Sequence, residues 1–368
     1  MNDMRETTGQ RQADRAPGGA AASLPLSDPT TEERSAAPAG TAALLWRRLR
    51  AQNTFWTFLV LAALVAVFSA LRPNAFATVF EFRSIATESS ILVLLAVGQT
   101  FVIITSGIDL SVGSVLIFSG VVAVQTMNAL DSSPQAGWGV IAAGTAAGLC
   151  AGVAWGTLNG FLIAKAKVPP LIVTLGTLGM ALGLAQIVTH GVDAGNLPSR
   201  LTDTVGSGSI LGIPWLIVIA VLVVAAAAFA LNMTRFGRYT LAIGSNAEGA
   251  ARVGIKADRH LIKVYALSGL LAGFAGVLNL AHFSSTTLTS GTQDNLNAIA
   301  AVVLGGTSLF GGTGTVIGTV IGVFIPAVLQ SGFTILQVQS FWQTVAVGAV
   351  LVAAVYFDQL RRRRRNSR

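Results

Sequence analysis

The sequence predicts an all-α membrane protein that crosses the bilayer many times. Of its 368 residues, 52% are hydrophobic and 11% are charged, and the mean hydropathy is +0.67. Ordinary soluble domains carry roughly 25% charged residues, so this chain has too few polar side chains to cover a soluble surface. Long apolar runs, each able to cross a hydrocarbon core of about 30 Å, recur along the chain. The predicted fold class is a polytopic integral membrane protein.

About ten apolar stretches are candidates for transmembrane helices, since a helix that crosses the membrane needs roughly 20 such residues. They lie at 53–71, 85–105, 110–128, 138–163, 169–189, 210–231, 261–281, 296–311, 314–333 and 341–357. The stretch 296–311 is the shortest. We expect one transmembrane domain over 46–360, with the first helix preceded by Trp46 and a group of arginines at the interface.

The basic residues predict the orientation of the chain. When the N-terminus is placed inside the cell, only Arg72, Arg83 and Arg200 fall outside, and every other Lys and Arg falls inside. This bias follows the positive-inside rule and predicts that both termini are cytoplasmic. The net charge of +8 therefore reflects membrane orientation and does not indicate nucleic-acid binding.

Both ends of the chain have the composition of solvated tails. Residues 1–45 are rich in Ala, Pro, Thr, Glu and Arg and predict a disordered cytoplasmic tail, with no apolar core typical of a signal peptide. Residues 361–368 predict a basic cytoplasmic tail. The single Cys150 lies in an apolar run, which excludes a disulfide framework and favours a packing role.

Two polar, glycine-bounded interruptions divide the apolar sequence. One is "ITSGIDLSVGSVL" (104–116) and the other is "VVLGGTSLFGGTGTVIG" (302–318). Interrupted segments at matching places in two halves indicate an internal repeat and point to the translocation path. Asp109 in the first interruption has two interpretations, a helix cap that accepts from the amide of Ser111 or Val112, or a side chain that lines the solute route.

The glycines of the second interruption predict helix packing and not phosphate binding. Gly314, Gly318 and Gly322 recur at four-residue spacing, which is typical of a packing face between membrane helices. The chain contains no G-x-x-x-x-G-K-[ST] motif, so ATP cannot bind by that route. The histidines are dispersed and no serine nucleophile has the required context. We therefore predict neither an enzyme, nor a metal site, nor a bound cofactor.

The basic stretch "TRFGRYTLAIGSNAEGAARVGIK" (234–256) separates two apolar runs and predicts a cytoplasmic coupling loop over 233–260. Ser245 and Glu248 have the spacing of a capping box, and Gly254 suits a helix stop. A helix of about eight residues is unstable alone in water, so its face of Ala247, Ala250, Ala251 and Val253 must lie against something. It packs either on its own bundle or in a groove of a soluble partner.

Four blocks of the sequence together resemble the permease subunits of ribose-type ABC sugar importers. The blocks are "SGIDLSVGSVL", "GTLNGFLIAKAKVPPLIVTLGTLGM", the 234–256 stretch with "YALSGLLAGFAGVL", and "AIAAVVLGGTSLFGGTGTVIGTVIG". The resemblance implies a homodimeric pore in the bacterial inner membrane with about ten helices per subunit. It also implies two partners, a cytoplasmic ABC ATPase and an extracytoplasmic sugar-binding protein.

The resemblance assigns the coupling helix to Asn246–Gly254. The implied coupling residues are Ser245, Asn246, Glu248, Ala250, Ala251 and Gly254. One departure from the family stands before the last block, where "TQDNLN" replaces an acidic stretch. Asn295 and Asn297 occupy positions where the family usually has carboxylates, which puts a standard pentose substrate, or the usual contact with the binding protein, in doubt.

The predicted function is that of the membrane permease of an ATP-driven importer for a monosaccharide or related polyol. Uncharged polar side chains suit a neutral polyhydroxylated solute, and the candidates for the translocation path are Gln99, Thr105, Asp109, Asn159, Thr174, Asn295 and Asn297. The alternative is an ion-coupled secondary transporter, which needs ionisable groups within its helices.

Overall fold

A computed structural model describes residues 53–288 and 293–339, together with scattered positions between 341 and 356. All of these residues belong to one compact unit, Arg47–Arg368. The predicted tails at 1–45 and 361–368 lie outside the described residues, as does most of the predicted span 341–357.

Eight helices in the described part of the chain are long and apolar enough to cross a membrane. They are α2 (Asn53–Leu71), α3 (Val79–Ile104), α4 (Val112–Leu130), α5 (Trp138–Ala164), α6 (Pro170–Thr189), α8 (Trp215–Met233), α11 (Ala257–Phe283) and α13 (Val316–Ile335). The all-α, polytopic fold class is thereby confirmed.

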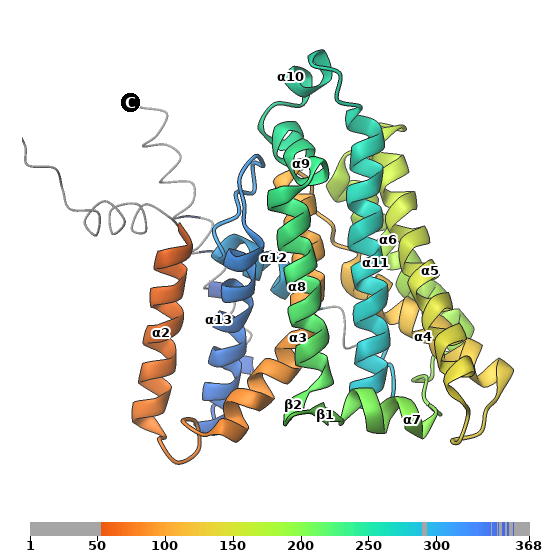
Figure 1. Cartoon of the computed structure of the whole chain (residues 1–368), viewed down its shortest axis with the longest axis vertical. Coiled ribbons are helices and arrows are strands. Elements are labelled where there is room, and N and C mark those ends of the chain that lie inside the picture. Colours follow the sequence, from red (N-terminus) through yellow and green to blue (C-terminus); the bar gives the residue numbers. More distant parts are fainter. Residues whose placement is uncertain are drawn as a thin grey trace, which may run out of the picture. The chain divides into compact units, whose positions relative to one another are not determined.

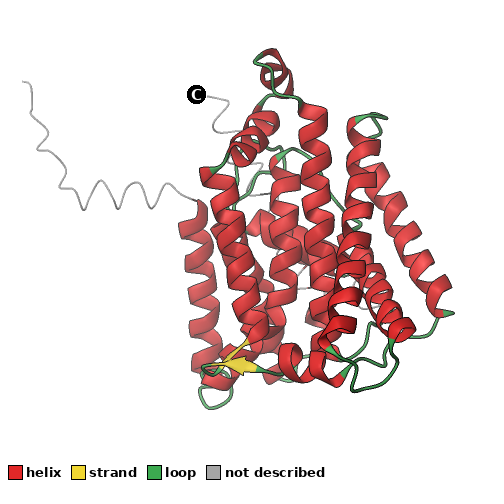
Figure 2. Ribbon diagram, turned by 45° about the vertical axis from the view of Figure 1, so that its right-hand side comes forward, coloured by secondary structure: helices red, strands yellow, loops and turns green. Residues whose placement is uncertain are grey.

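Short elements connect the long helices at the two ends of the bundle. At one end, α9 (Arg235–Ser245) and α10 (Ala247–Arg252) lie between α8 and α11. At the opposite end lie α7 (Ser199–Leu201), the π-helical turn η1 (Thr202–Gly206) and the antiparallel hairpin of β1 (Ser209–Ile210) and β2 (Ile213–Pro214). Figures 1 and 2 show α10 and the hairpin at opposite ends, and we call these the α10 end and the hairpin end.

The prediction of a full transmembrane span at 296–311 is wrong. Its helix α12 (Asp294–Leu304) has 11 residues, and at about 1.5 Å per residue it covers only about half of the hydrocarbon thickness. The helix ends because Gly305 and Gly306 follow Leu304, and Gly306 adopts a φ of +89°. The predicted count of ten spans is not confirmed, since eight full-length candidates and one half-length helix are described.

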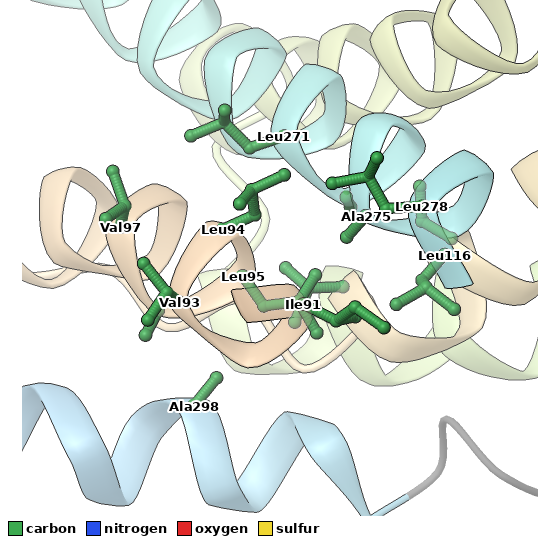
Figure 3. Close-up of a cluster of buried hydrophobic side chains, with 14 of the residues drawn as sticks. Ile91, Val93, Leu94, Leu95, Val97, Leu116, Leu271, Ala275, Leu278 and Ala298 are labelled. Carbon is green, nitrogen blue, oxygen red and sulfur yellow. The ribbon is translucent and has the colours of Figure 1, made fainter. Parts of the chain in front are cut away.

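Helix α3 forms the centre of the bundle and packs against α11, α13, α8 and α12. From Ile91 to Ile104 it is apolar on nearly all sides and almost fully buried, which is typical of a helix without a lipid-facing or solvent-facing side. Figure 3 shows Leu94 of α3 directed toward Leu271 and Ala275 of α11, while Ala298 of α12 lies on the other side of α3. By contrast, only 11% of the apolar window of α2 is buried, which suits a helix at the periphery of a membrane bundle.

Glycines allow α5 and α11 to touch through their backbones. A Cβ added at Gly152 would overlap the Gly269 carbonyl oxygen, and one at Gly156 would overlap the Tyr265 carbonyl oxygen. Small residues at four-residue spacing let membrane helices approach this closely. The predicted packing face on α13 is confirmed for Gly318 and Gly322, whose added Cβ atoms would overlap carbonyls of Gly305 and Ala301 next to and within α12.

Candidate functional site

Helices α9 and α10, which the sequence predicts to couple to a partner and which we call the coupling segment, project from the α10 end of the bundle (Figure 1). Thr234 caps α9, because its side chain accepts from the Gly237 amide at 3.4 Å. Helix α9 was not predicted as a separate element, since its sequence has no long apolar run. Asn246, with extended backbone angles of φ −160° and ψ 98°, separates α9 from α10. The change of direction between the two helices therefore takes place at a single residue.

The predicted capping box of Ser245 and Glu248 is wrong, and Asn246 caps α10 instead. The Asn246 Oδ1 atom accepts from the Gly249 amide at 2.8 Å. Ser245 is still part of α9 and donates to the Leu241 carbonyl at 2.9 Å. Asn is among the strongest N-cap residues, so the helix begins one residue later than the Ser–Glu spacing suggested.

The stop at Gly254 is confirmed. Gly254 has a φ of +86°, a conformation that glycine adopts without a steric penalty. Its amide donates to Ala251 and the next amide, of Ile255, donates to Ala250, both at 3.0 Å. This pair of bonds is the Schellman motif, and it satisfies the last carbonyls of α10.

One face of α10 touches the bundle and the rest is uncovered. Ala250 is 5% exposed, whereas Val253 is 77% exposed and Ala247 and Ala251 are also exposed. The coupling segment and the start of α11 carry exposed basic side chains, namely Arg235, Arg238, Arg252, Lys256, Arg259 and Lys263. The segment thus presents a small apolar surface surrounded by positive charge.

An ion-pair cluster fixes the start of α11 next to the coupling segment. The Asp258 carboxylate lies 3.0 Å from the ammonium groups of both Lys165 and Lys167. These lysines belong to the turn between α5 and α6, so the cluster joins that turn to α11. Exposed pairs of this kind are worth little in stability, but they restrict the position of the turn.

A buried polar network surrounds the first interruption. Asp109 is 2% exposed, and its Oδ1 atom accepts from the Ser111 amide at 3.0 Å and from the Ser111 hydroxyl at 2.6 Å. Its Oδ2 atom accepts from the Ser268 hydroxyl of α11 at 3.2 Å. The predicted bond to the Ser111 amide is confirmed, but Asp109 is not the N-cap of α4, because the helix begins at Val112 and Ser111 holds the cap position. A role of Asp109 in lining the solute route stays a prediction.

Three further predicted residues reach this network from other helices. Gln99 of α3 donates to the Asp109 carbonyl, and Asn159 of α5 donates to the Ser111 hydroxyl at 2.9 Å. Thr174 of α6 donates to the Ile108 carbonyl, at 3.2 Å. The fold thus gathers residues that are far apart in sequence around one helix break.

The two predicted asparagines of α12 differ in their surroundings. The Asn295 side chain is buried and accepts from the Gly113 amide in the first turn of α4. It therefore connects the half-length helix to the other side of the first interruption. Asn297 lies two residues further, on roughly the opposite side of α12, and is half-buried. Thr105, the C-cap residue of α3, is also buried and donates to the Val102 carbonyl in the last turn of that helix, at 2.8 Å.

Sequence reasoning missed several members of this region. Ser268 and Tyr265 are polar residues in the apolar part of α11, and that contrast is the signal that could have found them. The Ser111 hydroxyl lies in the turn before α4, where a serine gives no such signal. Among the described side chains, the buried Gln99 Oε1, Asn159 Oδ1 and Tyr265 hydroxyl have no hydrogen-bond partner within the protein. Buried polar atoms normally find partners, so this region has hydrogen-bonding capacity to offer a water or a solute.

Glu88 was also overlooked, although it lies inside the predicted span 85–105. It is exposed near the hairpin end of α3 and accepts from Ser84 at 3.3 Å. With Phe80, Arg83, Thr87 and His282 of α11, these two residues line a cavity of about 300 Å³. Charged groups thus enter the outer turns of an otherwise apolar helix.

The two interrupted segments meet in the structure. The Gly312 amide donates to the Ile104 carbonyl at 2.9 Å, and the Ser106 hydroxyl donates to the Phe310 carbonyl at 2.8 Å. Deeper in the bundle, the hydroxyls of Thr100 and Thr319 lie 2.7 Å apart. The segments that the sequence pairs as corresponding interruptions are therefore in direct contact.

Comparison with known proteins assigns the chain to a family. Residues 82–355 match the family described as the permease component of branched-chain amino acid transport systems. The ribose import permease protein of Escherichia coli K12 is 39% identical over 305 residues, which is 82% of this chain and 92% of the relative. The chain belongs to the sugar ABC importer permease family. The D-allose transport system permease protein of the same strain is 34% identical over 86% of this chain and 93% of its own length.

A third relative extends the range of sugars named among these permeases. The L-arabinose ABC transporter permease protein of Azospirillum brasilense is 35% identical over 90% of this chain and 94% of its own length. No solved structure shows a significant match. As a sugar ABC importer permease, the chain is a multi-pass inner-membrane translocation subunit that works with an ATPase and a substrate-binding protein.

Proposed function

We propose that this permease forms a homodimeric path for a neutral monosaccharide or related polyol, and that α10 receives the force of the ATPase. The observation that carries the proposal is the surface of α10, which is anchored by Ala250 and otherwise uncovered. A six-residue helix would not persist in water without partners. The surrounding positive charge suits a soluble subunit that approaches from the cytoplasm.

The substrate class is supported by the character of the buried polar groups. Gln99, Asn159, Thr174 and Asn295 are uncharged and buried, and they offer hydrogen bonds without a counter-ion. The relatives named for ribose, D-allose and L-arabinose point to the same class. The asparagine at 295 keeps an acceptor oxygen where relatives of this type usually have a carboxylate, so it can bind the Gly113 amide without a charge.

Coupling through α10 is tested by substitutions on its exposed surface and at its stop. We expect Glu248→Arg and Gly254→Trp to abolish solute uptake in vesicles and to leave membrane insertion intact. Gly254→Trp also forces an L-residue into a positive φ, which costs roughly 1 kcal/mol or more. Asp203→Arg, an equal charge reversal in the exposed turn at the hairpin end, serves as the control. Normal uptake with both α10 variants would exclude coupling at this helix.

The energy source for transport is tested at Asp109, which is 2% exposed and is the one buried acidic side chain among the described residues. Ion-coupled transport through these helices would need such a group to carry the ion. We expect uptake by Asp109→Asn to survive a protonophore and to stop when ATP is depleted. Loss of uptake in Asp109→Asn, together with wild-type uptake that a protonophore abolishes and ATP depletion does not, would favour the secondary transporter.

A further inference from the structure

Three backbone segments that are far apart in sequence meet at one point near the α10 end. They are the last carbonyl of α3 at Ile104, the last turn of α9 at Gly244, and the loop after α12 at Gly312. The Gly312 amide donates to the Ile104 carbonyl at 2.9 Å. A Cβ added at Gly244 would overlap that carbonyl and lie 2.7 Å from the Gly312 nitrogen. No side chain fits between the three segments, which we call the backbone junction.

The residues around the backbone junction are held in restricted conformations. Ser106, Gly311 and Gly312 have φ values of +64°, +82° and +78°, which L-residues rarely adopt. A Cβ at Gly311 would overlap the Ser106 hydroxyl, and one at Gly312 would lie 2.6 Å from the Ser245 hydroxyl. These glycines are therefore required both by their backbone angles and by the space available.

The backbone junction connects the coupling segment to both interruptions at once. Helix α10 follows α9 after only Asn246, and Gly244 is the residue of α9 that touches Ile104 and Gly312. From Ile104 the chain continues into the turn that contains Asp109. From Gly312 it leads back to α12, where Asn295 binds the first turn of α4. A shift of α9 thus acts on two segments that share the buried polar network.

Given the proposed coupling role of α10, we propose that Gly244 is a positioning residue that transmits displacement of α10 to both interrupted segments. The physical reason is stiffness. Side chains can change rotamer and absorb a small shift, whereas close-packed main chains without side chains between them cannot. Displacement of α9 therefore moves Ile104 and Gly312 together, and the two interruptions respond as a unit.

A packing role alone predicts a different result from transmission. If Gly244 served only to let the segments fit, a methyl group there would lower the amount of folded protein, and each surviving molecule would still import solute at the normal cost in ATP. If Gly244 transmits displacement, the methyl group changes the relative position of α9 and the interruptions. The number of solute molecules imported per ATP then falls, although the ATPase still binds.

The experiment uses the permease reconstituted in liposomes with its ATPase and its binding protein. Gly244→Ala is compared with Gly139→Ala in α5, where no atom lies within 4 Å of the added Cβ. We expect Gly244→Ala to retain the ATPase and its hydrolysis, and to import about tenfold less solute per ATP, a typical coupling between sites. The control should match the wild type. An unchanged number of solute molecules imported per ATP in Gly244→Ala would overturn the role of Gly244. Failure of the ATPase to bind the α10 surface of the wild type would instead overturn the proposed function.

A measurement on the wild-type complex decides the question if Gly244→Ala does not insert. Hydrogen exchange is followed in segments 104–111 and 305–315 with and without ATP, and in the loop 131–137 at the hairpin end as the control. We expect ATP to change exchange in both interrupted segments together. A change confined to α10, or in only one of the two segments, would show that the backbone junction does not transmit the motion.

Discussion

Asn246 shows how one side chain fixes the start of α10, the proposed coupling helix. Its Oδ1 atom accepts from the Gly249 amide, and loss of such a cap costs about 1 kcal/mol. We expect Asn246→Ala to destabilise α10 and to lower uptake, while Ser245→Ala, which loses only a bond within α9, has little effect. Hydrogen exchange of residues 247–252 measures the first effect directly. If residues 247–252 exchanged faster in Ser245→Ala than in Asn246→Ala, the result would instead support a capping box of Ser245 and Glu248.

Asp109 shows how one acceptor holds several donors. Its carboxylate receives the Ser111 amide, the Ser111 hydroxyl and the Ser268 hydroxyl. Removal of the carboxylate leaves these buried donors without an acceptor, which costs about 1–3 kcal/mol of folding stability for each donor. We expect Asp109→Ala to lower the thermal stability of the detergent-purified protein strongly and Asp109→Asn, which keeps one acceptor oxygen, to lower it less. Equal stability of Asp109→Ala and the wild type would mean that the network is not essential to the fold.

Single residues of the site could be predicted from the sequence, but their connections could not. Gln99, Asp109 and Asn159 stand out as polar residues in apolar surroundings. Ser111, which contacts Asp109 and Asn159, does not. Serine is common in turns and its neighbours are known only after the helices pack. The cap was assigned to the wrong residue for a related reason. Two adjacent cap-forming residues, Ser245 and Asn246, left the helix start ambiguous by one position.

At the scale of elements, the contact of α5 with α11 depends on the absence of side chains. A Cβ at Gly152 or Gly156 would overlap backbone atoms of α11. We expect Gly152→Leu to prevent folding or to cost more than the about 1–3 kcal/mol of ordinary overpacking. Gly139→Leu, on the same helix with open space around it, is the matched control. Yield and thermal stability in detergent are the measurements, and similar values for the two variants would contradict the packing.

Hydropathy locates elements better than it measures their length. Most predicted spans match described helices to within a few residues, because an apolar run of about twenty residues has few other uses. The length of the helix in 296–311 was overestimated, because mean hydropathy does not show that Gly305 and Gly306 end the helix. Helix α9 was not predicted because its sequence mixes polar and apolar residues and carries no apolar run, although both of its ends are capped.

At the scale of the whole molecule, α6 offers a surface for the second subunit of the proposed homodimer. Gly176, Gly179 and Gly183 have no atom within 4 Å of an added Cβ, and Leu175 and Met180 beside them are 58% and 55% exposed. Small residues at such spacing favour close helix contacts in membranes. Within one chain, this face of α6 has space for another helix.

We expect Gly179→Cys to form a disulfide-linked dimer under oxidation, after the exposed Cys150 is replaced by Ala. Leu222→Cys on α8, also exposed at 65%, should remain monomeric on denaturing gels and is the control. Cross-linking at Leu222 without cross-linking at Gly179 would place the subunit interface on α8 instead.

The arrangement of charge over the whole molecule predicts which end faces the cytoplasm. The α10 end carries the exposed arginines and lysines of the coupling segment, and such residues are retained inside during insertion. The hairpin end carries few basic residues, and the tip of its hairpin at Leu211 is 98% exposed. In cysteine-free protein, an impermeant maleimide should therefore reach Leu211→Cys in intact cells once the outer membrane is permeable. It should reach Glu248→Cys only after the inner membrane is opened, because α10 must lie where ATP is available. Labelling of position 248 in sealed cells would show that α10 faces away from the cytoplasm, where no cytoplasmic ATPase could reach it.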